Sequence, residues 1–102
     1  MAKRIILYNL ADNITDEQFK EYVTTDKGPL ISSLPAVNKY QLTKISSASQ
    51  PAIPYKYVGI VDVTSIEEFD GKAGPTPEYQ GFLKKFMPMV KDLLILSGEE
   101  IY

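Results

Sequence analysis

The sequence of 102 residues contains no histidine, no cysteine and no tryptophan. Without histidine and cysteine there is no Ser–His–Asp or Cys–His nucleophile, no usual zinc site and no His- or Cys-ligated haem. The lack of any disulfide fits a cytoplasmic protein. Carboxylates, lysines and tyrosines remain as titratable groups, and none titrates near pH 7 unless its surroundings shift its pKa. We therefore expect neither a metal nor a cofactor.

Positive charge is also sparse and scattered. Arg4 is the only arginine, the net charge is −2 and the pI is about 5.0. A nucleic-acid partner, such as RNA on an RRM-type sheet, would require a basic patch with stacking aromatics, and none is present. There is no charged n-region followed by an apolar h-region, and no apolar run approaches roughly 18 residues, so we expect neither secretion nor a membrane span. The length is that of one domain, residues 1–102, with 44% hydrophobic residues for a modest core.

The first half of the chain predicts a strand, a helix and a second strand. The β-rich run 4–10 is followed by Thr15 and Gln18, which have the spacing of a capping box, so a helix is expected over 15–26. Gly28 and Pro29 are expected to end it. Residues 29–35 predict one short helical turn, and the alternation over 36–46 predicts the second strand.

The second half predicts the same order of strand, helix and strand. Residues 55–63 predict a third strand, joined to the second by the Ser/Pro-rich loop 47–54 as a hairpin. Ser65 with Glu68 predicts a capped turn over 64–69, broken at 70–75, and Thr76 with Pro77 predicts a helix over 76–90. The last strand, followed by a tail, is expected within 92–102. The order β-α-β-β-α-β predicts an α+β, ferredoxin-like fold: a four-stranded antiparallel sheet with both helices on one face.

Apolar residues occupy both sides of the predicted strands. On the first strand the two alternating sets are Ile6, Tyr8 and Leu10 against Ile5, Leu7 and Asn9, and on the third Val58 and Ile60 against Val61 and Val63. A short chain with a sheet that is apolar on both faces needs a partner for the face without helices. We expect a homodimer in which two sheets pack face to face, and in which the segment 26–40 forms the mouth of the enclosed cavity.

Specific segments resemble a known superfamily. Gly28–Pro29–Leu30, Leu34–Pro35 and Tyr40 are similar to the H-x-P-L…LPG…Y segment of the dimeric α+β barrel proteins, especially the EthD-like branch. Over nearly the whole chain, "RIILYNL", "KGPLISSLPAV", "YVGIVDVTSIEEF" and "ILSGEEIY" resemble the small REDY-like proteins encoded with prodigiosin-type red pigment pathways. The resemblance implies a dimeric barrel and a role in pigment assembly, on the branch that makes the bipyrrole half.

Two departures from the superfamily pattern limit what is carried over. Lys27 stands where many EthD-like proteins have histidine, and Ala36 stands where they have glycine. The missing histidine removes the obvious general base of cyclase or cofactor-free oxygenase chemistry.

Lys27, Tyr8 and Tyr40 are candidate ligand-binding residues. Lys27 is expected at the helix end, where it either stabilises the helix dipole or, as a cation at the barrel mouth, receives an acidic or carbonyl-bearing ligand. Tyr8 and Tyr40 either share the barrel face and contact a planar heteroaromatic ligand, or serve in ordinary packing.

Asp62 is the tentative catalytic residue, because it interrupts the apolar run "VGIVDV". A buried carboxylate must be paired or have a raised pKa, which suits a general acid or base. It either points into the cavity with Val58 and Ile60, or lies at the strand end, exposed or paired with a lysine such as Lys44.

Two functions of different classes follow. One is a binding protein that holds a hydrophobic aromatic pathway intermediate in the barrel cavity, and that protects it or passes it to another pathway enzyme. The alternative is a cofactor-free cyclase, isomerase or aromatising enzyme that uses aspartate and tyrosine for proton transfer. A bipyrrole-sized ligand requires a cavity on the order of 300 Å³, and in this fold we expect such space only between the sheet and the opposing chain.

Overall fold

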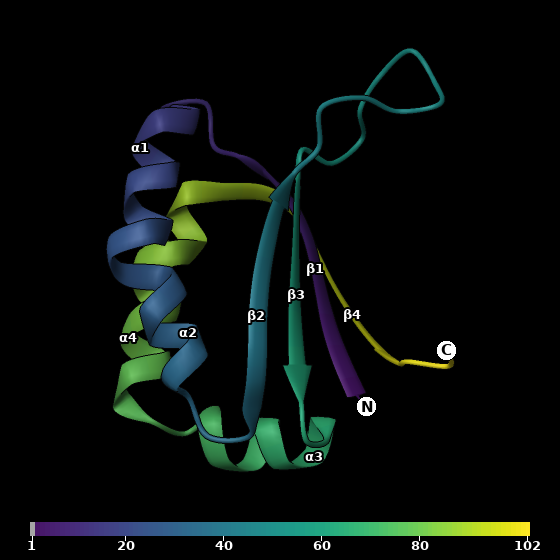
Figure 1. Cartoon of the computed structure of the whole chain (residues 1–102). Helices are drawn as coiled ribbons and strands as arrows, with labels where there is room; N and C mark the ends of the chain where they lie inside the picture. The colour runs from purple at the N-terminus through teal and green to yellow at the C-terminus, as the bar shows by residue number, and fades with distance from the viewer. Residues whose placement is uncertain (1) are drawn as a thin grey trace.

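A computed structural model describes residues 2–102 and shows a four-stranded antiparallel sheet with helices on one face (Figure 1). The strands are β1 (Ala2–Leu10), β2 (Val37–Lys44), β3 (Tyr57–Val63) and β4 (Val90–Glu99), in the order β2-β3-β1-β4. All three neighbouring pairs are antiparallel, including the predicted β2–β3 hairpin. The predicted α+β, ferredoxin-like order is confirmed.

The first helical segment starts where the capping box predicts. The Thr15 hydroxyl accepts from the Gln18 N–H at 3.1 Å, and the Gln18 side chain accepts from the Thr15 N–H at 2.9 Å. The α-helix α1 (Asp16–Tyr22) follows directly. Phe19 and Tyr22 on its inner side are buried against the sheet.

The prediction that Gly28 and Pro29 end this helix is wrong. The chain instead forms a π-helical turn, η1 (Val23–Lys27), and continues as α2 (Gly28–Ser33). The Gly28 N–H donates to the Val23 carbonyl, the i→i+5 bond of a π turn, and Gly28 keeps helical dihedrals. A Cβ on Gly28 would lie 2.9 Å from that carbonyl oxygen, so the glycine permits a close approach inside a continuing helix. Pro29 is tolerated in the first turn of α2, where its missing N–H matters least.

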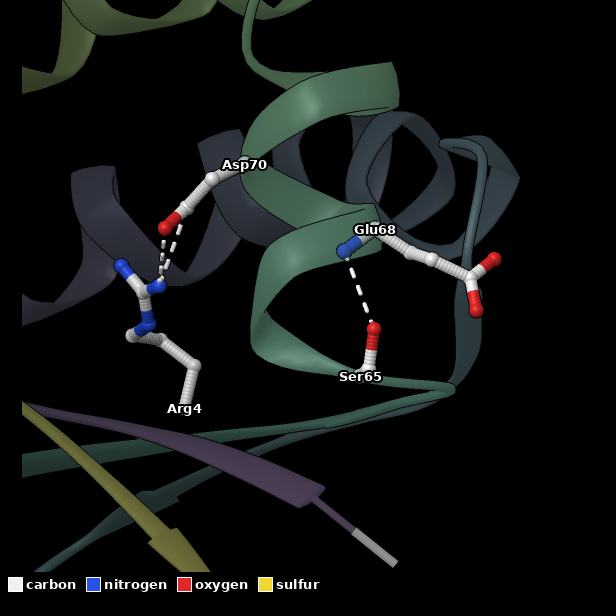
Figure 2. Close-up of polar contacts among 4 residues, drawn as sticks. All are labelled: Arg4, Ser65, Glu68 and Asp70. Carbon is white, nitrogen blue, oxygen red and sulfur yellow. Dashed lines mark hydrogen bonds and ion pairs between the residues drawn. The ribbon is translucent and has the colours of Figure 1, made fainter.

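The second helical segment uses the same arrangement. Ser65 accepts from the Glu68 N–H at 3.0 Å and caps α3 (Ile66–Glu68), as predicted (Figure 2). The predicted break over 70–75 is partly wrong, because the π turn η2 (Phe69–Ala73) continues α3 before the chain turns at Gly74 and Pro75. The Gly74 N–H donates to the Phe69 carbonyl, and a Cβ on Gly74 would lie 2.5 Å from the Asp70 carbonyl oxygen. In both segments a Gly–Pro pair follows a π turn.

The last helix and strand complete the core. Thr76 caps α4 (Pro77–Phe86), and Pro88 falls in the short 3-10 turn η3 (Met87–Met89) that leads into β4. The strand begins at Val90, two residues before the predicted start. The buried core lies between the helices and one face of the sheet, and comprises Tyr8, Phe19, Tyr22, Ile31, Leu34, Tyr57, Val61, Val63, Phe69, Ala73, Phe82 and Phe86. Within residues 2–102, none of the helices has the length and apolar character needed to cross a membrane.

Candidate functional site

The sheet divides the predicted site residues into two groups. Side chains alternate between the faces of a strand, and the buried positions of β3 are Tyr57, Gly59, Val61 and Val63. Val58, Ile60 and Asp62 therefore face the side without helices. Tyr8, Tyr40 and Lys27 lie together on the helix side. No single site contains all six residues.

Lys27 is the central residue of the helix-side group. It is only 4% exposed, and its Nζ donates to the Tyr8 phenolic oxygen at 3.0 Å. Four aromatic rings surround the amine, with ring centroids 4.5 Å away at Phe86, 5.1 Å at Tyr8, 5.3 Å at Tyr40 and 5.6 Å at Phe19. Cation–π attraction offsets part of the cost of taking the charge out of water.

This environment changes the acid–base behaviour of the amine. None of the ion pairs formed within residues 2–102 includes Lys27. Burial without a carboxylate partner disfavours the charged form and lowers the pKa of Lys27 to about 7. Lys27 thus supplies a titratable group near neutral pH in a chain that has no histidine.

The predicted position of Lys27 at a helix end is incorrect, because η1 and α2 continue the helix past it. A sequence signal for its burial was present. Phe19, Val23, Lys27 and Ile31 recur every four residues, which places Lys27 on the apolar stripe of a helix that extends to Ser33.

An apolar cleft reaches Lys27 from the surface. Its enclosed part has a volume of about 60 Å³ and lies between α4 and the strands β1 and β4. The cleft is lined by Arg4, Ile6, Lys27, Ile31, Tyr40, Val61, Phe69, Tyr79, Phe82, Leu83, Phe86, Met87, Leu93 and Ile95. Met87 is 48% exposed and Ile95 54% exposed, so these two side chains mark its open side.

Two polar atoms of the cleft-lining residues have no hydrogen-bond partner within residues 2–102. They are the Tyr40 hydroxyl and the Arg4 Nε, and both are buried. Burial raises the pKa of Tyr40, so its phenol remains protonated and able to donate. Buried polar groups in proteins are nearly always paired with protein groups or ordered water, so both atoms are open to a partner.

Arg4 is held in place at its far end. Its Nη2 donates to both carboxylate oxygens of Asp70 at 2.9 and 3.1 Å, and its guanidinium lies 5.7 Å from the Phe69 ring centroid. Figure 2 shows the side chain extending from β1 to the turn at Asp70. Sequence reasoning missed Arg4 as a cleft residue, although it is the only arginine of the sequence and precedes the apolar run Ile5–Leu7.

Asp62 lies on the open face and forms an ion pair with Lys3, which is also 3.0 Å from Glu100. Its partner is therefore Lys3, in register with it on the adjacent β1, and not the suggested Lys44, which pairs with Asp16. The centre of this face is apolar, with Ile5, Leu7, Val58, Ile60, Leu94 and Leu96 in register across β3, β1 and β4. Leu94 and Leu96 are 40% and 41% exposed.

The segment 26–40 contributes to the helix side. Lys27 and Ile31 from its helical part and Tyr40 from its strand line the cleft, and Leu34 joins the core. Ala36, in the place of the superfamily glycine, has a φ of 68°, and its carbonyl accepts from the Thr64 N–H at 2.9 Å. The segment thus aligns β2 and supplies the buried amine.

Comparison with known families identifies the chain. The sequence model of the family described as REDY-like protein HapK matches residues 2–101. The chain belongs to this family. No curated protein sequence matches this REDY-like chain.

Solved structures confirm the fold. HapK from Hahella chejuensis has a TM-score of 0.81 at 24% identity, covering 99% of this chain and 93% of that one. An EthD family protein from Bacillus halodurans has a TM-score of 0.80 at 22% identity, covering 99% of both chains. A dimeric ferredoxin-like protein from Thermobifida fusca has a TM-score of 0.74 at 18% identity, covering 97% of this chain and 90% of that one.

Proposed function

We propose that this REDY-like protein acts in a prodigiosin-type pigment pathway by binding a planar aromatic intermediate at the cleft beneath α4. The observation that carries the proposal is the pair of unpartnered polar atoms, Tyr40 Oη and Arg4 Nε, in a cleft otherwise walled by aromatic and aliphatic side chains. Flat rings pack favourably against such walls, while a few placed polar groups fix the orientation of the ligand. Membership of the REDY-like family supports a role in such a pathway.

The size of the cleft defines how much of the ligand it holds. The enclosed volume of about 60 Å³ is well below the roughly 300 Å³ of a pocket for a drug-sized molecule. One end of a bipyrrole-sized intermediate therefore enters the cleft. The remainder lies along the exposed side chains of Met87 and Ile95, where another pathway enzyme would reach it.

The proposal includes a homodimer formed through the open face of the sheet. The six in-register apolar residues of this face form a contiguous patch, in which Leu94 and Leu96 are 40% and 41% exposed. Lys3 beside Asp62 and Glu100 gives the rim both signs of charge, which suits a two-fold interface of identical patches. The dimeric ferredoxin-like neighbour supports a second copy as the occupant.

A matched pair of substitutions tests both parts. Ile95 and Leu94 are neighbours on β4 that face the cleft and the open face respectively. We expect Ile95→Glu to weaken retention of the pathway intermediate by about tenfold or more and to leave the dimer intact, since a charge in an apolar cleft is costly. Leu94→Glu should dissociate the dimer.

The measurement is native mass spectrometry of each protein purified from cells that make the pigment. Wild-type protein should be a dimer carrying a small-molecule mass. Equal retention by Ile95→Glu and wild type would overturn the cleft as the binding site. A monomeric wild-type protein would overturn the dimer.

The alternative function, a cofactor-free enzyme, is favoured by a different observation. The Lys27 amine has a pKa of about 7, so it is suited to taking up and releasing a proton at neutral pH, and the neutral Tyr8 phenol holds it by a hydrogen bond. Asp62 lies on the opposite face, so proton transfer through it would require a ligand between the sheets of a dimer. Turnover of the retained intermediate, lost in Lys27→Met, would establish this alternative.

A further inference from the structure

We propose that Lys27 forms a reversible imine with an aromatic aldehyde or ketone that enters the cleft. The proposal deepens the proposed function, on which it rests, by assigning the ligand a carbonyl group and the protein a covalent bond to it.

The geometry around Lys27 is that of a nucleophilic amine. Lys27 lines a cleft that opens to solvent, and the one hydrogen bond that its Nζ makes within residues 2–102 is the bond to Tyr8. No carboxylate within residues 2–102 lies within ion-pair distance to hold it as an ammonium ion. A lysine desolvated in a hydrophobic pocket is the typical amine of Schiff-base chemistry with carbonyl substrates.

The acid–base state of the amine supports the same step. With a pKa of about 7, about half of Lys27 is neutral at pH 7, whereas an exposed lysine near 10.5 is almost wholly protonated. The reactivity of Lys27 towards a carbonyl compound can therefore be compared with that of the exposed lysines in the same protein. Only the neutral amine carries the lone pair that attacks a carbonyl carbon.

The reaction is balanced without an oxidant or a reductant. The Nζ lone pair forms a bond to the carbonyl carbon, and the C=O π pair moves to oxygen, which takes up a proton as the nitrogen loses one. The resulting carbinolamine loses its hydroxyl, with a further proton, as water, and the nitrogen lone pair closes the C=N bond. Hydrolysis reverses the sequence and releases the carbonyl compound.

The unpartnered groups of the lining have a place in this step. Tyr40 is a buried, protonated phenol that has no acceptor among residues 2–102, so it can donate to the oxygen that develops charge during the attack. The four rings around Nζ make stacking contacts available to an aromatic carbonyl compound and shield the imine from bulk water. These features select a flat aromatic aldehyde over a small aliphatic one.

The test uses pyrrole-2-carboxaldehyde as the probe. Whole protein at pH 7 is incubated with the aldehyde and sodium cyanoborohydride, which reduces an imine to a stable secondary amine, and the modified lysine is found by peptide mapping. We expect modification of Lys27 to exceed that of any of the other nine lysines by at least about tenfold. Modification spread evenly over the exposed lysines, or absent, would overturn the proposal.

Two variants test whether the adduct depends on the Lys27 amine itself. Lys27→Met retains an unbranched apolar side chain and should lose the dominant adduct, while Lys85→Met, which removes an exposed lysine, should retain it. Circular dichroism checks that both are folded. The peptide mapping of wild-type protein decides the proposal by itself. If Lys27→Met does not fold, an even or absent modification of the wild-type lysines still overturns the proposal.

The alcohol pyrrole-2-methanol separates this proposal from the proposed function, since it has the same ring but cannot form an imine. Binding of the alcohol in the cleft, observed by NMR, without an adduct from the aldehyde would overturn the imine and leave the binding function standing. If neither compound binds nor reacts, the imine is overturned, and retention of the native intermediate decides the binding function separately.

Discussion

Lys27 Nζ lies 3.0 Å from the phenolic oxygen of Tyr8, and this hydrogen bond joins the π turn after α1 to the central strand β1 beneath it. Both side chains are buried, Tyr8 completely. The pair places an amine in the lining of a surface cleft. The four-residue spacing of Phe19, Val23, Lys27 and Ile31 indicates that Lys27 is buried, but it does not specify Tyr8 as its partner.

The buried amine predicts a pH dependence of stability. Burial lowers the folded-state pKa of Lys27 to about 7, so the unfolded chain, with a value near 10.5, binds the proton more tightly. The cost of burying the charge is therefore fully present below pH 7 and is relieved as the pH rises from 7 towards 10.5. Lys27→Met removes this cost, and should be more stable than wild type at pH 6.

The measurement is chemical unfolding of both proteins between pH 6 and 9. The stability difference should shrink by roughly 2–3 kcal/mol over this range. The titratable groups facing Lys27 are the phenols of Tyr8 and Tyr40, whose pKa values burial raises, so they stay neutral throughout. Lys85→Met, at a side chain 62% exposed, is the control and should show no such trend. A difference that is constant with pH would contradict the prediction.

Tyr40→Phe removes a cleft hydroxyl that has no hydrogen-bond partner within residues 2–102. Because an unsatisfied buried group costs on the order of 1 kcal/mol, we expect stability to stay equal or to rise by up to about that amount. Binding of pyrrole-2-methanol should weaken by about fivefold. Tyr8→Phe is the matched control: it deletes the acceptor of the Lys27 bond and should lower stability by about 1 kcal/mol. Tighter binding to Tyr40→Phe would count against the hydroxyl as a ligand contact.

Asp62→Asn tests the sequence hypothesis that this carboxylate acts in the site. Its ion pair with Lys3 is partly exposed, at 21% and 25% for the two side chains, so the substitution should cost less than about 1 kcal/mol. Asp62 faces away from the cleft, and affinity for a cleft ligand should change less than about twofold. A large loss of affinity or turnover in a folded dimer would instead show that the ligand contacts the open face.

Ala36→Gly should stabilise the protein. Ala36 has a φ of 68°, in the left-handed region, where a Cβ costs about 1–2 kcal/mol. Part of this gain is offset by the greater freedom of glycine in the unfolded chain, which leaves about 0.5–1 kcal/mol. Thermal unfolding measures the change, with Ala52→Gly in the exposed loop as the control, expected to be neutral or slightly destabilising. A lower melting temperature for Ala36→Gly would contradict the strain.

The order of strands and helices was determined by local sequence. Capping boxes, prolines in first turns and β-rich runs act over a few residues, so the starts of α1, α3 and α4 and the hairpin were all predicted. The helix ends were not. A Gly–Pro pair usually stops a helix. At Gly28–Pro29 the helix instead continues through a π turn into α2, which packs against α4 and β2. At Gly74–Pro75 a second π turn extends the helix up to the pair.

The sequence by itself determined the chemical inventory: no histidine or cysteine, one arginine, and a sheet apolar on both faces. The tertiary structure decided which of these groups meet. Face alternation separated Asp62 from the tyrosines, because a one-residue step along a strand moves a side chain to the other side of the sheet. The π turn and the helix beyond it buried Lys27 among four rings contributed by β1, β2, α1 and α4. Its pKa near 7 is a property of that assembly, since desolvation depends on the elements that surround the amine and not on its neighbours in the chain.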